Sequence, residues 1–354
     1  MNLTVNGHNV WIIVLVSFLA SVIITPIVKK LAIHVGAMDV PNERKVHTKP
    51  MPRLGGLSIF LSFMLGYMLY ARESTMMLSV LIGSFFIILC GIFDDINPIK
   101  AKYKFIVQLI SAATVCIYGN LVLTEITIFG YNLFFSPPFS YIITILFMVG
   151  VMNVMNLIDG LDGLASGISS IYFITIAIIA FILNQMGGLD IILSLIMAGA
   201  TLGFLVHNFP PASIFLGDTG SYFLGFIISV IGLLGYKAAT LTSIIIPISI
   251  LAIPIFDTFS AIVRRLLKHQ NPFTNPDKEH LHHQFLKMKL SPRVTILIIY
   301  LITILFSAVS IYFAIGDQEM SIIIYLTLML FLIFLVMKTD ILFKHKKKDK
   351  KDKE

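Results

Sequence analysis

Apolar runs long enough to cross a lipid bilayer recur along nearly the whole chain. A helix rises about 1.5 Å per residue, so roughly 20 residues span a hydrocarbon core of about 30 Å. We count eleven such runs, although several are short or interrupted by Gly or Pro. The runs are approximately residues 10–28, 54–70, 77–93, 105–118, 141–157, 164–183, 191–206, 222–236, 241–263, 294–315 and 322–337. This pattern predicts an all-α polytopic membrane protein.

The composition agrees with a membrane location. Of the 354 residues, 57% are hydrophobic and only 13% are charged, which is too few charged side chains to cover a water-soluble surface. No Lys or Arg precedes the first apolar run, and that run is longer than the core of a cleavable signal peptide. We therefore expect the first run to be retained as a membrane helix.

The basic residues predict the orientation of the chain in the membrane. Cytoplasmic loops carry an excess of Lys and Arg. With the N-terminus outside and the C-terminus inside, 24 of the 26 basic residues lie on the cytoplasmic side, leaving only Arg72 and Lys237 outside. The net charge of +7 then sits beside lipid headgroups and does not indicate nucleic-acid binding. We predict one integral-membrane domain, residues 1–343, and a polybasic tail, residues 344–354, that either touches anionic lipid or is solvated.

The carboxylates gather at one predicted face of the membrane. A carboxylate near a bilayer is unfavourable unless it is paired, hydrated or bound to a metal. With the topology above, the cytoplasmic boundary receives six of them from four parts of the chain, namely Asp94, Asp95, Asp159, Asp162, Asp218 and Asp257. This placement predicts a polar cleft at the cytoplasmic face. The sequence indicates no firm role for Asp257.

The adjacent pair Asp94 and Asp95 is the first candidate group. Two neighbouring carboxylates repel each other unless a divalent cation or nearby lysines offset the second charge. Lys100, Lys102 and Lys104 follow the pair. The group is therefore either a metal or phosphate site, or an acidic helix end solvated beside a basic loop.

A second group interrupts the apolar sequence with amides, carboxylates and glycines. Its polar side chains are Asn153, Asn156, Asp159 and Asp162. Such a break is tolerated at membrane depth only where protein or water covers it. Capping of a helix needs one such residue and not four. This segment is therefore predicted to form the floor of the cleft.

A third group surrounds Asp218. Asn208 precedes it, and the run Gly-Asp-Thr-Gly-Ser at residues 217–221 places the carboxylate between glycines just before an apolar run. Amides at a helix N-terminus can hold phosphate oxygens, while a carboxylate there can hold a hard cation that bridges to the same phosphate. The alternative is a simple N-cap.

Three histidines, His280, His282 and His283, lie in the longest predicted cytoplasmic loop. Histidines so placed bind zinc, contact a sugar or phosphate, or are solvated. No cysteine or second histidine cluster completes a zinc set. We therefore predict an oxygen-rich Mg²⁺ site made by the aspartates, with Mn²⁺ as a substitute ion, and histidines that contact the substrate.

Over nearly its whole length the sequence resembles the polyprenyl-phosphate N-acetylhexosamine-1-phosphate transferases. Five motifs occur in the order of that superfamily, namely residues 39–56, the Asp94-Asp95 pair with residues 101–104, residues 156–163, residues 217–221 and the histidine run at residues 280–283. The histidine run is similar to that of the branch that uses UDP-N-acetylglucosamine. Residues 96–100 form a shorter segment than in the muramoyl-pentapeptide branch, so that branch's extra lysines have no counterpart assigned here.

The resemblance implies a role for each candidate residue. It assigns Asp218 to Mg²⁺ and assigns Asp94 and Asp95 to the reacting lipid phosphate. It places Asn156 and Asp159 between the nucleotide and the catalytic centre. The implied substrate-binding residues are Lys102 near the lipid phosphate, Gly160, Leu161, Asp162, Asn208 and Phe215 around the uridine, and His280, His282 and His283 at the phosphate and sugar.

The implied reaction transfers N-acetylglucosamine 1-phosphate from UDP-N-acetylglucosamine to undecaprenyl phosphate and releases UMP. We expect direct attack by the lipid phosphate, on the cytoplasmic side of a bacterial cytoplasmic membrane. The implied partners are these two substrates and membrane lipid, and a homodimer is left open. For the downstream polymer we favour the linkage unit of wall teichoic acid over a lipopolysaccharide-type antigen. A transporter would place its acids near the bilayer midplane, and a structural scaffold leaves their placement unexplained.

Overall fold

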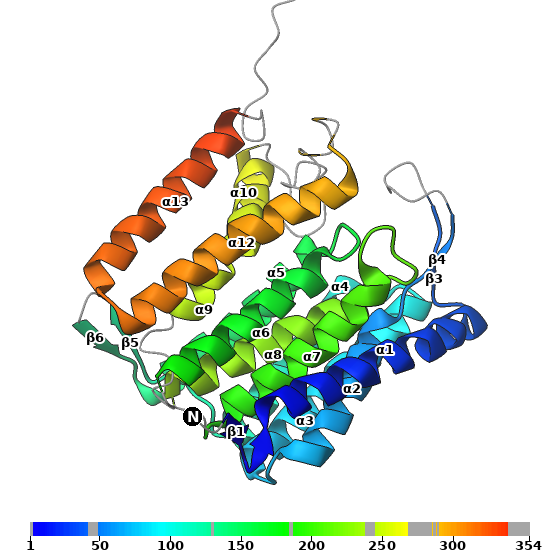
Figure 1. Ribbon diagram of the computed structural model, residues 1–354, viewed down its shortest axis with the longest axis horizontal. Coiled ribbons are helices and arrows are strands. Elements are labelled where there is room, and N and C mark those ends of the chain that lie inside the picture. The colour runs from blue at the N-terminus through cyan, green and yellow to red at the C-terminus, as the bar shows by residue number, and fades with distance from the viewer. Residues whose placement is uncertain are drawn as a thin grey trace, which may run out of the picture.

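The computed structural model describes residues 3–41, 49–128, 131–183, 187–237, 245–267, 285, 288 and 290–338. Most of these residues are helical, and the helices pack side by side as a bundle, with α12 and α13 along one side and α1 and α2 along the other (Figure 1). Three small antiparallel sheets of two strands each complete the described part of the chain.

The helices differ widely in length. In chain order they are α1 (Val10–Val35), α2 (Gly55–Tyr70), α3 (Thr75–Ile96), α4 (Ala101–Ala113), the π-helical turn η1 (Thr114–Tyr118), α5 (Pro137–Ile158), α6 (Leu164–Ile182), α7 (Leu189–Asn208), α8 (Gly217–Lys237), α9 (Ile245–Ile250), α10 (Ala252–Leu267), α12 (Pro292–Ile315) and α13 (Gln318–Lys338). The strands pair as β1 (Thr4–Val5) with β2 (His8–Asn9), β3 (Met38–Asp39) with β4 (Met51–Pro52), and β5 (Glu125–Ile128) with β6 (Tyr131–Phe134).

Seven of the described helices are long and apolar enough to cross a membrane, judged by length and composition. They are α1, α3, α5, α6, α7, α8 and α12, and three shorter apolar helices occupy Gly55–Tyr70, Ala252–Val263 and Gln318–Phe334. Each of the eleven predicted runs overlaps described helical residues, although run 105–118 is divided between α4 and η1 and run 241–263 between α9 and α10. The polytopic, mainly α-helical class is therefore confirmed, while eleven crossings stay a prediction.

Helix α8 is the most enclosed of the seven candidate spans, and α1 is the least. The outer face of α1 exposes large apolar side chains such as Trp11, Ile23 and Ile27, each more than 60% accessible. Apolar side chains on an outer face are compatible with lipid tails, which are equally apolar. By contrast, α8 packs against α2, α3, α5 and α7. The N-terminus of α8 is consequently held by several neighbours at once.

Two glycines allow α2 and α3 to touch the first turn of α8. A Cβ on Gly56 would lie 2.1 Å from the Cα of Gly220, and a Cβ on Gly91 would lie 2.3 Å from the Cα of Thr219. Neither distance can accommodate a real side chain, because the atoms that it would meet are backbone. The close approach brings the C-terminal end of α3 against the start of α8.

Substitution of Gly56 by Ala is expected to destabilise the protein by at least about 1–3 kcal/mol, because the added methyl group must displace the backbone of α8. Gly150→Ala is the matched control, since a Cβ on Gly150 would have no atom within 4 Å. Thermal unfolding of the detergent-purified variants would compare the two. An unchanged unfolding midpoint for Gly56→Ala would contradict the close contact between α2 and α8.

Candidate active site

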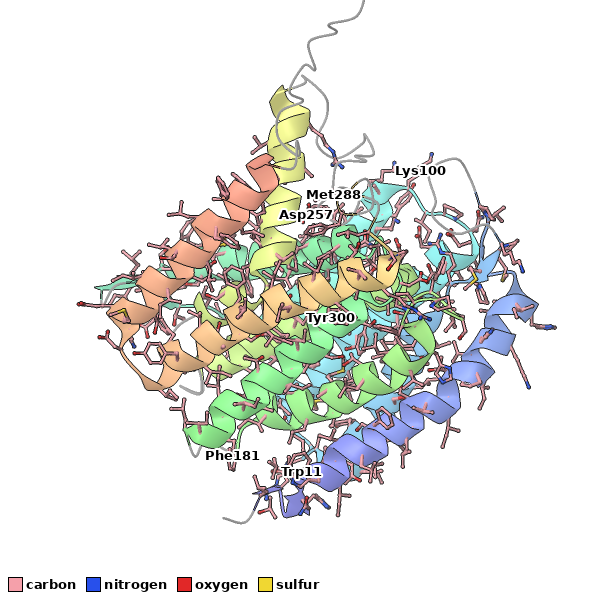
Figure 2. The ribbon with its side chains drawn as sticks, turned by 45° about the horizontal axis from the view of Figure 1, so that its top comes forward. Trp11, Lys100, Phe181, Asp257, Met288 and Tyr300 are labelled. Carbon is pink, nitrogen blue, oxygen red and sulfur yellow. The ribbon has the colours of Figure 1, made fainter. Side chains whose placement is uncertain are left out.

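Five elements meet at one end of the bundle, where α3 and α5 end and α2, α4 and α8 begin. Asp94 and Asp95 lie in the last turn of α3, Asn156 in the last turn of α5, and Asp218 is the second residue of α8. Figure 2 marks this end by Lys100, which immediately precedes α4, and shows Asp257 on the separate helix α10. Residues as far apart in sequence as Asp94 and Asp218 are therefore brought together here.

Three carboxylates form the centre of this end of the molecule. Asp94, Asp95 and Asp218 each place an oxygen within 4.8 Å of the other two. The side chains of Asp94 and Asp95 are 4% and 0% exposed, whereas that of Asp218 is 19% exposed. Asp218 is therefore the member of this cluster that a molecule arriving from solvent meets first.

Lys104, from the first turn of α4, bridges two of the three carboxylates. Its Nζ donates to Asp94 Oδ2 at 3.0 Å and to Asp218 Oδ2 at 2.8 Å. Burial by itself would lower the pKa of Lys104, but the two carboxylates outweigh burial and raise its pKa above the ordinary value. The ammonium group is therefore protonated at neutral pH, and it occupies a position between two convergent acids.

Asp95 has a different environment from its neighbour Asp94. Its Oδ1 accepts hydrogen bonds from Arg53 Nε at 3.0 Å, from Arg53 Nη2 at 2.9 Å and from the backbone N–H of Asp218 at 2.9 Å. Its Oδ2 accepts from the N–H and the hydroxyl of Thr219 at 3.1 and 2.6 Å. A carboxylate receiving N–H groups at the start of a helix stabilises that helix end. Asp95 thus ties the end of α3 to the start of α8.

Asn156 and Asp159 lie on the α5 side of the carboxylate cluster. Asn156 Nδ2 donates to Asp218 Oδ1 at 3.2 Å and to Ser221 Oγ at 2.9 Å. Asp159 ends α5, and its pKa is raised well above the ordinary value, first by burial and then by the charges of Asp218 and Asp95. A positive charge bound at the cluster would oppose that shift.

The residues predicted around the uridine lie in the loop before α6, at the last residue of α7 and in the loop after α7. Asn208 Oδ1 accepts from the N–H of Gly163 at 3.0 Å and from the hydroxyl of Ser166 at 2.8 Å, and its Nδ2 donates to Ile214 O at 2.9 Å. Asp162 Oδ2 accepts from the N–H of Ala212 at 2.9 Å. These bonds join the loop before α6 to the loop after α7.

The remaining predicted residues of this region differ in exposure. Gly160 is exposed, Phe215 is partly buried and Leu161 is buried, 7% accessible. Contact between this region and the uridine stays a prediction. His280, His282 and His283 lie outside the described residues.

The structure brings four polar residues to the cluster that lie in the predicted motifs but received no individual role from the sequence, namely Arg53, Lys104, Thr219 and Ser221. Lys102, which the resemblance places near the lipid phosphate, is exposed, and its Nζ lies 4.9 Å from the ring centroid of Tyr103. Its contact with a phosphate stays a prediction. Residues two apart on a helix point to different faces, so only one of the two lysines can face the cluster. Helical periodicity therefore indicates that either Lys102 or Lys104 faces the cluster, but it does not indicate which one.

The donor set suits a hard divalent cation. Asp94 Oδ2 and Asp218 Oδ2 come from different helices yet accept from one ammonium group, so they converge on a single cation position. Carboxylate oxygens are the ligands that Mg²⁺ prefers. Asp95 is a poorer ligand because protein donors already surround both of its oxygens. These residues therefore fit a cation held mainly by Asp94 and Asp218.

Comparison with known proteins gives this site a family. Residues 77–236 match the family described as glycosyl transferase family 4. The chain is 44% identical, over 90% of its own length and 88% of the relative's, to a probable undecaprenyl-phosphate N-acetylglucosaminyl 1-phosphate transferase of Bacillus subtilis (strain 168). It is 34% identical to a decaprenyl-phosphate N-acetylglucosaminephosphotransferase of Mycobacterium tuberculosis, over 77% of this chain and 75% of that one.

A third relative, an undecaprenyl-phosphate alpha-N-acetylglucosaminyl 1-phosphate transferase of Salmonella typhi, is 30% identical over 83% of this chain and 81% of its own. The matched residues include both the end of α3 and the start of α8, which supply the three clustered carboxylates. The chain therefore belongs to glycosyl transferase family 4 and is an enzyme of the polyprenyl-phosphate N-acetylhexosamine-1-phosphate transferase superfamily.

Proposed function

We propose that this enzyme transfers N-acetylglucosamine 1-phosphate from UDP-N-acetylglucosamine to undecaprenyl phosphate, producing undecaprenyl-diphospho-N-acetylglucosamine and UMP. The observation that carries the proposal is the convergence of Asp94 and Asp218 on one cation position, beside Arg53, at an end shared by several apolar helices. The similarity to the Bacillus subtilis relative, which is named for this transfer, supports the choice of substrates.

The charges at the open face of the site suit two anionic reactants. Arg53 and Lys104 have side chains 23% and 20% exposed, and they flank the partly exposed Asp218. Bringing phosphate to phosphate in a partly dry site is opposed by Coulomb repulsion, which is stronger there than in water. The two cationic side chains offset part of that repulsion and orient the phosphate oxygens.

Asp218 and Asp94 would hold Mg²⁺, with Mn²⁺ as a substitute. When bound, such an ion neutralises diphosphate charge and stabilises the departing UMP. The lipid phosphate needs little help from a base, because a phosphate monoester with a second pKa near 6 is already largely ionised at neutral pH. Asp94 is therefore not needed as a base, and its Oδ2, which accepts from Lys104, is free to serve as the cation ligand when an ion displaces that ammonium group. An oxygen of the lipid phosphate attacks the β-phosphorus of the UDP-sugar, and the bond to the UMP oxygen breaks.

The topology proposed with this function has eleven crossings, the N-terminus outside and the active site on the cytoplasmic side. Cytoplasmic segments of membrane proteins carry an excess of Lys and Arg. Arg53 and the lysines of the α4 N-terminus occur at the same end as the cluster, which supports a cytoplasmic location for that end. A cytosolic nucleotide and a membrane lipid would meet at that boundary. For the product we propose a cell-envelope polymer, with the linkage unit of wall teichoic acid favoured.

The direct test is an assay of the purified full chain with UDP-N-acetylglucosamine, undecaprenyl phosphate and Mg²⁺. We expect UMP release that requires both substrates and is lost when EDTA removes the metal. Omission of the lipid phosphate is the control for simple hydrolysis of the sugar nucleotide. Purified protein that binds Mn²⁺ yet releases no UMP with these substrates would overturn the proposed reaction.

Lys104→Met is expected to lower turnover by about 10²-fold, because it removes a cation that orients phosphate. The same change is expected to tighten Mn²⁺ binding without substrate, because the ammonium group no longer competes for Asp94 and Asp218. Electron paramagnetic resonance of free Mn²⁺ measures that affinity. The exposed Lys100 supplies the control Lys100→Met. Unchanged Mn²⁺ affinity in Lys104→Met would place the cation elsewhere.

A further inference from the structure

Arg53 lies between four carboxylates but is bonded closely to only one of them. Its Nε and Nη2 donate to Asp95 Oδ1 at 3.0 and 2.9 Å. Its guanidinium nitrogens lie 3.6 Å from Asp39, 3.8 Å from Asp94 and 3.9 Å from Asp218. The guanidinium therefore contributes to the field of the whole cluster, while its directed hydrogen bonds reach Asp95 alone among these acids.

The backbone around Arg53 holds it in this place. The segment from Pro52 to Gly56 pairs with the residues that precede α8, since Phe215 N–H donates to Pro52 O at 2.8 Å and the N–H groups of Gly55 and Gly56 donate to Phe215 O and Leu216 O at 2.9 and 2.8 Å. Arg53 thus reaches the cluster from a strand-like segment attached to the start of α8. Its position is set by that pairing and does not depend on the side chain alone.

Asp95 contacts both Arg53 and the backbone of Asp218. It accepts the N–H groups of Asp218 and Thr219, and its Oδ2 would lie 2.4 Å from a Cβ placed on Gly217, which has a φ of +74°. The start of α8 therefore rests directly on the Asp95 carboxylate. A buried carboxylate that loses its counter-ion is destabilised and rearranges toward water. That rearrangement would loosen the backbone that carries Asp218.

We propose that Arg53 is a positioning residue for the cation site, acting through Asp95 to hold Asp218 in the orientation that binds the ion. Its role in turnover rests on the proposed function, whereas its role in cation binding does not. The alternative role is electrostatic screening, in which Arg53 only lowers the negative potential of the cluster. The two roles predict opposite effects of its removal on cation affinity.

Mn²⁺ binding to the full chain in detergent, without substrates, separates these roles. If Arg53 positions Asp218, Arg53→Met weakens Mn²⁺ binding by about 10- to 100-fold, the usual loss when a partner of a metal ligand is removed. If Arg53 only screens charge, the loss of one positive charge tightens Mn²⁺ binding. Arg72→Met is the matched control, because Arg72 is exposed just beyond the opposite end of α2. That control is expected to bind Mn²⁺ like the wild type.

Arg53→Lys keeps the test decisive if Arg53→Met does not fold. Lysine retains the positive charge but cannot direct two N–H groups at one carboxylate oxygen. Positioning predicts weaker Mn²⁺ binding for Arg53→Lys, whereas screening predicts wild-type affinity. Tighter or unchanged Mn²⁺ binding in the folded variants would overturn the proposal. Failure of the wild type to release UMP would instead overturn the proposed reaction and leave this result standing.

Discussion

Asp218→Asn is expected to lower the rate of Mg²⁺-dependent UMP formation by about 10³-fold or more, while the protein stays folded. Asp218 is the most exposed acid of the three-carboxylate cluster, and its two oxygens accept from Asn156 and Lys104. Asparagine preserves the shape and one acceptor but removes the charge that binds the cation. Stabilisation by a bound metal is worth several kcal/mol, and each tenfold in rate corresponds to about 1.4 kcal/mol.

The measurement for Asp218→Asn is UMP release over a range of Mg²⁺ concentrations, together with the thermal unfolding midpoint. Asp317→Asn is the matched control. Asp317 also lies at the start of a helix, where its Oδ1 accepts from Glu319 and Met320 N–H, and an amide oxygen can make the same bonds. Near-normal turnover of Asp218→Asn at the usual Mg²⁺ concentration would remove Asp218 from the metal role.

Asp95→Asn is expected to lower the stability of the fold strongly, in contrast to Asp218→Asn, which mainly lowers turnover. Both oxygens of Asp95 accept hydrogen bonds, five in total. In asparagine one of these oxygens becomes an N–H₂ group, which would then face a donor and could not accept its hydrogen bond. Arg53 would also lose its closest counter-ion. Breaking a buried ion pair by removing one partner costs about 3–5 kcal/mol.

Thermal unfolding of Asp95→Asn and Asp218→Asn side by side tests this division of roles. Both changes convert a carboxylate into an amide within the same cluster, so each variant is a control for the other. We expect a clearly lower midpoint only for Asp95→Asn. Equal midpoints for the two variants and the wild type would show that Asp95 does not anchor the start of α8.

Much of the fold class was predictable, because the constraint behind it is local. A stretch of apolar residues that must satisfy its backbone hydrogen bonds in lipid becomes a helix whatever its neighbours are. The runs therefore fell on helices, and their ends located Asp94, Asp95 and Asp218 at helix termini. Run 241–263 was harder to read, since Ile245–Ile250 and Ala252–Leu267 form separate helices.

The division of labour within the cluster was not predictable from the residues alone. Asp94 and Asp95 are adjacent and identical in type, yet consecutive residues on a helix point about 100° apart. Asp94 consequently meets Lys104, whereas Asp95 meets Arg53 and the start of α8.

By itself the sequence determined that this chain is a helical membrane protein with Asp94, Asp95 and Asp218 at helix ends, because hydrophobicity and charge act along the chain. The tertiary structure alone decided that Lys104 and not Lys102 faces the acids, and that Arg53 contacts Asp95 from 42 residues away. Those choices depend on helix rotation and on close packing at Gly56 and Gly91, which are set by contacts between distant segments.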